Sequence, residues 1–130
     1  MIVALFEDEN YKNFLPLTYS RPVFMLRSGM LTALERTERM FPKARMFLFS
    51  RDYLTPILRR RFKYPINLLD RIDEEFLLIN GTMVLNQQTS RLIETKLKPN
   101  VAVTKNERLA IARLSEKVAR TKGQVLLKPT

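Results

Sequence analysis

Three short apolar runs, separated by helix-like and loop-like segments, determine the fold class of this chain. They are Met1–Phe6, Arg45–Phe49 and Phe76–Ile79. Continuous apolar runs of this length, without polar alternation, are typical of strands covered on both faces of a parallel sheet. The sequence therefore predicts an α/β fold, in which these runs are neighbouring strands of one mostly parallel sheet with helices on both faces and right-handed crossovers.

The first crossover helix is predicted over Met30–Phe41, because its apolar residues recur at helical spacing on one face. Two starts are possible. Ser28 can cap the helix directly, and Thr32 with Glu35 forms a capping-box pattern one turn later. Pro42 ends the segment.

Further elements are weaker in the pattern. A second helix starts at Ser50 or Thr55, with Pro56 at its first position if Thr55 is the cap, and Arg59–Arg61 lies at its C-terminal end, where cations favour the helix dipole. The remaining candidates are a strand at Pro65–Leu69, helices at Gln87–Lys96 and Ser115–Thr121, and a C-terminal hairpin that turns at Lys105-Asn106-Glu107.

Length and composition limit the chemistry. A chain of 130 residues with 45% hydrophobic residues predicts one domain over residues 1–130. The chain has no cysteine and no histidine, which excludes disulfides, thiol catalysis, a Ser-His-Asp triad and nearly all zinc sites. No run approaches the roughly 20 apolar residues of a membrane span, and the N-terminus lacks a basic signal-peptide region, so we expect a cytoplasmic protein that does not enter a membrane.

The formal net charge of +10 is concentrated near the C-terminus. Residues 81–130 hold 10 Lys and Arg against 3 Asp and Glu, whereas the first eighty residues are nearly balanced. Solvated surface cations explain such a surplus, and nucleic-acid binding is the alternative. Self-association is also compatible with the sequence.

The segment Leu15–Glu35 combines loop signals with side chains suited to phosphate. Pro16 and Pro22 disfavour helix, so Thr18–Arg27 should form a loop that leads into a helix N-terminus. Arg21 and Arg27 then lie near helix amide groups, and guanidinium groups beside a helix N-terminus suit an anion. Because strand ends gather ligands in open α/β sheets, we expect residues 6–8, 49–51 and 80–82 to converge on this loop.

Two motifs carry a resemblance to a known family. The pattern P-L-T-x-x-R-P followed by L-R-x-G-x-x-T, together with Leu77-Leu78-Ile79-Asn80-Gly81, resembles the N-terminal part of the sugar nucleotidyltransferase family. The similarity is greatest to the bifunctional sugar-1-phosphate uridylyltransferase/glucosamine-1-phosphate acetyltransferase type, which makes UDP-N-acetylglucosamine. It implies a Rossmann-like sheet in an incomplete nucleotidyltransferase fold, a nucleoside triphosphate and a sugar 1-phosphate as substrates, and Mg²⁺ as cofactor.

The resemblance also implies roles for individual residues. Arg21 and Arg27 would contact phosphate oxygens as the catalytic pair, and the substrate-binding residues would be Thr18, Tyr19, Gly29, Asn80 and Gly81. It identifies no metal ligand. Where the broader family has a glycine-rich loop after the first strand, Glu7–Phe14 has no glycine, and Thr82 occupies the position of its metal-binding Asp, so we expect no turnover from this chain alone.

Structural explanations compete with several of these roles. Arg27 can pair with Glu7, Asp8 or Glu35 and fix the loop, and Thr18 can bond to nearby backbone. Gly81 fits a type I′ or similar turn after Asn80. Three functions follow: the nucleotide-binding part of a sugar-1-phosphate nucleotidyltransferase, a non-catalytic nucleotide or sugar-nucleotide binding domain, or a basic nucleic-acid interaction module.

Overall fold

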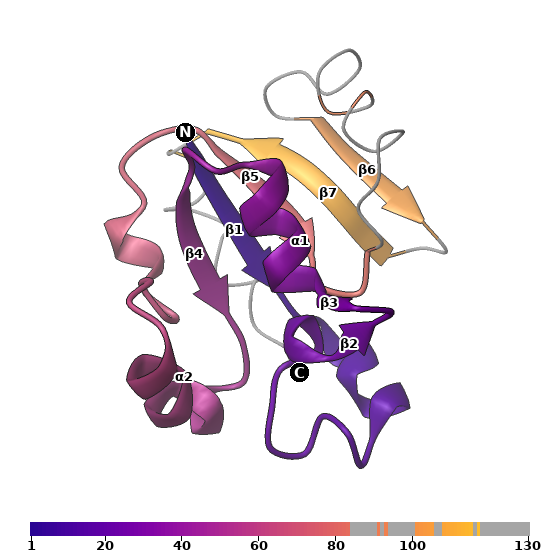
Figure 1. Ribbon diagram of the computed structural model, residues 1–130. Helices are drawn as coiled ribbons and strands as arrows, with labels where there is room; N and C mark the ends of the chain where they lie inside the picture. The colour runs from indigo at the N-terminus through magenta and orange to yellow at the C-terminus, as the bar shows by residue number, and fades with distance from the viewer. Residues whose placement is uncertain (84–90, 92, 94–100, 106–107, 116, 118–130) are drawn as a thin grey trace.

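The predicted parallel core of the sheet is confirmed. The computed structural model describes residues 1–83, 91, 93, 101–105, 108–115 and 117. Its main sheet has five strands in the order β4-β1-β5-β7-β6 (Figure 1). Strand β1 pairs in parallel with both β4 and β5, so the three apolar runs are neighbours. The strands are β1 (Ile2–Phe6), β4 (Arg45–Phe49), β5 (Phe76–Asn80), β6 (Val101–Lys105) and β7 (Arg108–Leu114).

The C-terminal hairpin is also confirmed. Strands β6 and β7 pair antiparallel, and β7 runs antiparallel to β5. A register shift between Val103 and Thr104 interrupts the β6–β7 ladder, as a β-bulge does. The sheet therefore changes from parallel to antiparallel at β5, the strand that ends in Asn80.

Helix α1 (Ala33–Met40) begins later than its earliest predicted start. Thr32 is the N-cap, and its capping box with Glu35 is complete, at 3.0 and 3.1 Å. The prediction that Ser28 caps the helix was wrong, because strands β2 (Arg27–Ser28) and β3 (Leu31–Thr32) form a small hairpin instead. Gly29 has φ +76°, which suits the first position of a two-residue hairpin turn, and Met30 is 86% exposed rather than part of the apolar face.

Helix α2 (Thr55–Arg61) follows the short 3₁₀ helix η3 (Asp52–Leu54). Leu54 rather than Thr55 precedes the first helical residue, Pro56 lies in the first turn, and Arg59–Arg61 forms the last turn as expected. The predicted strand at Pro65–Leu69 was wrong: Ile66 makes an isolated parallel bridge to Leu48, and Asn67 then adopts φ +56°, which ends the extended path.

The sheet is covered on both faces by helical segments. On one face, Leu34 of α1 and Leu58 of α2 join a buried cluster with Val3 and Leu5 of β1. On the other, Ile72 and the 3₁₀ helix η4 (Leu69–Arg71) pack against the alternate residues of the same strands. Each side chain buried in this way contributes about 1.5–3 kcal/mol, so the strand residues hold the sheet together.

Two predicted helices, over residues 87–96 and 115–121, lie largely outside the described residues. Within the part of the chain that the structure describes, none of the helices has both the length and the apolar character needed to cross a membrane. A cytoplasmic location and self-association stay predictions.

Candidate functional site

The ends of the parallel strands converge on the Thr18–Arg27 loop, as the sequence predicted. Gly81, after β5, donates its N–H to the carbonyl of Phe6 at the end of β1, at 2.7 Å. Glu7, the next residue, accepts the backbone N–H of Val23 in the loop at 3.0 Å. From the end of β4, the guanidinium of Arg51 reaches the same loop, where its Nη2 donates to the carbonyl of Thr18. Three strand ends therefore meet the loop at one edge of the sheet.

A buried ion pair lies at the centre of this edge. Arg51 Nε is 2.7 Å from Glu7 Oε1, and the two side chains are 7% and 0% exposed. Glu7 Oε1 also accepts the backbone N–H of Arg51 at 3.0 Å. The Arg51 Nη2 donates to the carbonyls of Thr18 and Arg21 at 2.6 and 3.0 Å. The pair is thus bonded to the loop as well as to itself, which is what a buried charge pair needs.

Aromatic rings enclose the guanidinium of Arg51. Its central carbon lies 4.0 Å from the ring centroid of Tyr11 and 5.2 Å from that of Tyr53, both within cation–π range. Its Nη1 donates to the Tyr53 hydroxyl at 2.5 Å, and that hydroxyl donates to the carbonyl of Tyr19 at 2.9 Å. Tyr11 and Tyr53 therefore extend the contact between Arg51 and the loop.

Next to this network is a pocket of about 300 Å³. This volume is at the lower end of the roughly 300–1,000 Å³ typical of ligand sites. Most of its wall is apolar, while two arginines and the turn after β5 supply polar groups. The lining residues are Phe14, Leu17, Val23, Leu26, Arg27, Ala33, Arg36, Gly81, Thr82 and Met83.

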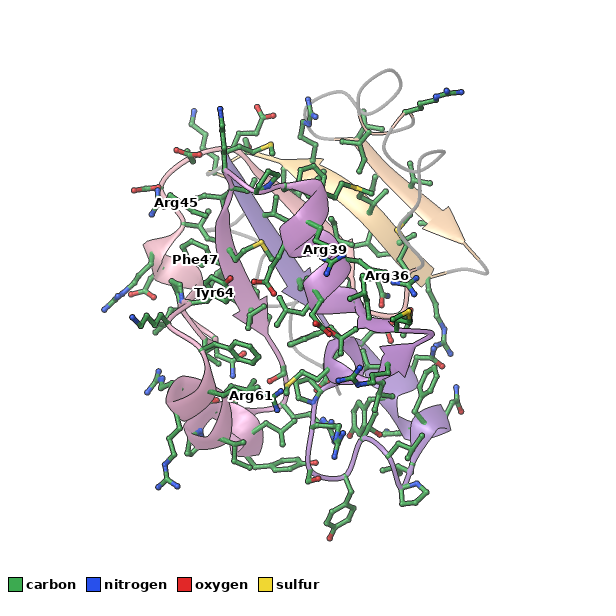
Figure 2. All side chains as sticks on the ribbon, viewed as in Figure 1. Arg36, Arg39, Arg45, Phe47, Arg61 and Tyr64 are labelled. Atoms are coloured by element: carbon green, nitrogen blue, oxygen red, sulfur yellow. The ribbon has the colours of Figure 1, made fainter. Side chains whose placement is uncertain are left out.

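The two arginines approach the pocket from different elements. Arg27 lies on β2 and donates from Nη1 to the carbonyl of Met30 at 3.2 Å. Arg36 projects from α1, as Figure 2 shows, and a Cβ added to Gly29 would lie 3.5 Å from its Nη2. The β2–β3 hairpin thus gathers two positive charges beside an apolar wall, an arrangement suited to an anion that carries an apolar group.

The N-terminus of α1 is occupied by its own cap. Hydrogen bonds from the backbone and hydroxyl of Thr32, with a further contribution from the charges of Arg27 and Arg39, hold the pKa of Glu35 below its ordinary value. A charged carboxylate already lies at this helix end. The arginines therefore carry the positive side of the pocket, and the helix end adds little to it.

Of the residues predicted to bind substrate from the loop, one lines the pocket and the others do not. Arg27 lines the pocket, whereas Arg21 is exposed, lies outside the lining set and uses its carbonyl to bind Arg51. Thr18 is fully buried and donates its hydroxyl to the carbonyl of Tyr11 at 2.7 Å. Tyr19 is 74% exposed, and Gly29 forms the hairpin turn.

Asn80 and Gly81, at the end of β5, serve structure as well as the pocket. Asn80 donates to the carboxylate of Asp8 and to the carbonyl of Leu109, both at 2.9 Å. Gly81 lines the pocket and lies in a turn, as predicted, since the N–H of Met83 donates to the carbonyl of Asn80 at 2.9 Å; the turn is not of type I′, because the φ of Gly81 is not positive. Close packing requires the glycine instead: a Cβ there would lie 2.9 Å from the Cβ of Phe24 and 3.1 Å from the carbonyl oxygen of Phe6.

Sequence reasoning missed three residues of this region: Glu7, Arg51 and Arg36. A signal for the first two was present. Each is the first charged residue after an apolar strand, the two strands are parallel neighbours, and the charges are opposite, so an ion pair at that edge was a reasonable expectation. Arg36 gave no such signal, because an arginine on a helix is ordinarily solvated.

The described residues do not form a metal centre by themselves. They contain no group of three or more acidic side chains placed to hold an ion. Of the two carboxylates that follow β1, Glu7 is paired with Arg51, and the two oxygens of Asp8 accept hydrogen bonds from the Asn10 N–H and the Asn80 amide. These residues therefore do not fit a Mg²⁺ ion held chiefly by the protein.

Many cations of the basic C-terminal surplus belong to residues outside those that the structure describes. Among the cations with defined positions, Arg113 lies 3.6 Å from Glu75. Nucleic-acid binding stays a prediction.

Comparison with known proteins identifies the family of this chain. No curated protein matches the chain. Residues 3–128 match the sugar nucleotidyl transferase family. The matched range covers nearly the whole chain and includes both the strand ends and the pocket. The chain belongs to the sugar nucleotidyl transferase family.

Proposed function

We propose that the chain is the nucleotide-binding portion of a sugar-1-phosphate nucleotidyltransferase, and that the pocket beside the β2–β3 hairpin holds a phosphate-bearing substrate. The observation that carries the proposal is the position of Arg27 and Arg36 on one apolar pocket at the carboxyl edge of parallel strands. Open α/β sheets bind ligands at this edge. Family membership supports a nucleotide or sugar phosphate as the ligand.

The two parts of the pocket suit the two parts of such a ligand. Phe14 and Leu17 offer an apolar surface for a base or sugar ring, while the guanidinium groups of Arg27 and Arg36 can each donate two hydrogen bonds to phosphate oxygens. In nucleotidyl transfer, an oxygen of the sugar 1-phosphate attacks the α-phosphate of the nucleotide, and pyrophosphate leaves. Positive groups fixed in advance stabilise the charge that accumulates there.

The finer assignments rest on the resemblance. Uridine as the base, N-acetylglucosamine as the sugar and a relation to the bifunctional type are part of the proposal, as is Arg21 as an outer phosphate contact on the same loop. Magnesium would arrive with the triphosphate. We expect binding without turnover in this chain.

Calorimetric titration tests the proposal. UTP, UDP-N-acetylglucosamine and N-acetylglucosamine 1-phosphate are titrated with and without Mg²⁺ into the parent chain, R27Q and R36Q. A charge-assisted hydrogen bond contributes about 1.5–3 kcal/mol, so each variant should bind roughly tenfold or more weakly. Arg59→Gln, an exposed arginine in the last turn of α2, is the matched control and should bind as the parent does. The proposal would be refuted if the parent bound none of these ligands at millimolar concentration, or if R27Q and R36Q both bound them as tightly as the parent does.

A further inference from the structure

We propose that Glu7 and Arg51 are positioning residues, which set the affinity of the pocket by holding the Thr18–Arg27 loop over the strand ends. This inference rests on the proposed function for its ligand, but its structural part stands independently. Neither residue lines the pocket. They act through the backbone of the loop that supplies Val23, Leu26 and Arg27 to it.

Arg51 fixes the first half of the loop. Its Nη2 bonds the carbonyls of Thr18 and Arg21, three residues apart, and its Nη1 bonds Tyr53, which in turn bonds the carbonyl of Tyr19. The planar guanidinium directs these donors in fixed directions. The loop carbonyls are therefore bound at fixed positions by a side chain from the end of β4.

Glu7 fixes the second half. Its Oε2 accepts a hydrogen bond from the N–H of Val23 at 3.0 Å. Val23 is the first residue of the 3₁₀ helix η2 (Val23–Met25). Within this turn, the N–H of Leu26 donates to the carbonyl of Val23 at 3.1 Å, and Arg27 follows directly. The side chain of Val23 also packs against Gly81 at the end of β5. A rigid turn thus connects Glu7 to the pocket arginine.

Because the ion pair is buried, its hydrogen bonds to the loop cannot be replaced by bonds to water. The carboxylate of Glu7 is fully buried, so water cannot replace a lost partner at its oxygens. Its bonds go to Arg51 and to the loop, and the two sets depend on each other: the guanidinium neutralises the carboxylate that holds Val23. Movement of the loop would therefore disrupt the ion pair, and loss of the pair would release the loop.

The test compares the double variant Glu7→Leu/Arg51→Met with the parent and with Arg45→Met. The double variant removes both charges together, so that no unpaired charge is buried. Arg45 lies at the opposite end of β4 in a solvent-exposed ion pair with Asp73, which makes it the matched control (Figure 2). Hydrogen exchange of residues 15–27, with the Val23 amide as the direct reporter, is measured without ligand, and UTP affinity is measured by calorimetry.

We expect the double variant to exchange the Val23 amide at least tenfold faster while the amides of β1 and β5 keep their protection, and to bind UTP at least tenfold more weakly. Arg45→Met should change neither. Unchanged exchange of the loop would overturn the inference, as would faster exchange with unchanged UTP affinity. If the parent fails to bind UTP, the proposed function falls, and loop exchange alone decides whether the pair positions the loop. If the double variant loses strand protection, Arg51→Lys takes its place, because it keeps the charge but not the planar donors.

Discussion

The two ends of the parallel sheet handle charge in opposite ways. At the end where β1, β4 and β5 begin, three ion pairs lie at least partly in solvent: the N-terminal amine with Glu74 at 3.0 Å, Arg45 with Asp73 at 3.0 Å, and Arg113 with Glu75 at 3.6 Å. At the end where the same strands finish, the pair of Glu7 with Arg51 is buried beneath the loop.

Strand β4 shows the contrast within one element, because an arginine begins it and another follows its end. The side chain of Arg45 is 53% exposed, whereas that of Arg51 is 7% exposed. An exposed pair gains little, since water solvates both charges well. A buried pair is costly to form and still more costly to break, because either partner alone becomes an uncompensated buried charge. Burial, more than the type of residue, decides what each arginine does.

The largest effect should follow from Arg51→Ala, which leaves Glu7 buried without its cation. Breaking a buried pair costs about 3–5 kcal/mol, a large part of the roughly 5–15 kcal/mol that stabilises a typical domain. Urea denaturation of the parent and the variant would measure the difference. A loss below about 1 kcal/mol would mean that Glu7 finds water or another partner, and the two ends of the sheet would then be alike.

A smaller effect is expected for Gly81→Ala, at the same end of the sheet but without charge. The new Cβ would meet the Cβ of Phe24 at 2.9 Å and the Phe6 carbonyl at 3.1 Å, so the loop must shift away from β5. Overpacking of this kind costs about 1–3 kcal/mol. Thermal denaturation of both proteins measures it. Gly29→Ala is the comparison, since its Cβ would meet no atom closer than 3.5 Å and its cost comes from φ alone. A Gly81 variant as stable as the parent would contradict the close packing of loop and strand.

Patterns that repeat along the chain predicted much of this architecture. The apolar runs predicted three neighbouring parallel strands. Because parallel strands all end at the same side of the sheet, they also predicted that the strand ends meet the loop. The start of α1 depended on a finer balance, because Ser28 and Thr32 are both good caps, and a hairpin turn at Gly29 decided between them. Local sequence does not encode which of two such competing structures packs better.

The candidate site was less accessible to prediction. Arg27 and Gly81 were identified from motif and loop character, and both line the pocket. Arg36 and the buried Glu7–Arg51 pair depend on contacts between residues far apart in the sequence, since 44 positions separate Glu7 from Arg51. The burial of a charge follows from what packs over it, and here that cover is the loop itself.

The smallest effect should come from Arg45→Ala at the solvent end. Its Nη1 lies 3.0 Å from Asp73, and its guanidinium lies over the ring of Phe47 at 5.9 Å from the centroid. Both partners are more than half exposed, so the ion pair should contribute about 0–1 kcal/mol, with a cation–π contribution of similar size at most.

A double-mutant cycle with Asp73→Ala, measured by urea denaturation at low and high salt, isolates the pair. We expect a small coupling energy that decreases as salt rises, because exposed charges are screened over about 10 Å at 0.1 M salt. A coupling energy above about 2 kcal/mol that resists salt would show that this exposed end stabilises the sheet as a buried pair does, and burial would no longer explain the difference between the two arginines of β4.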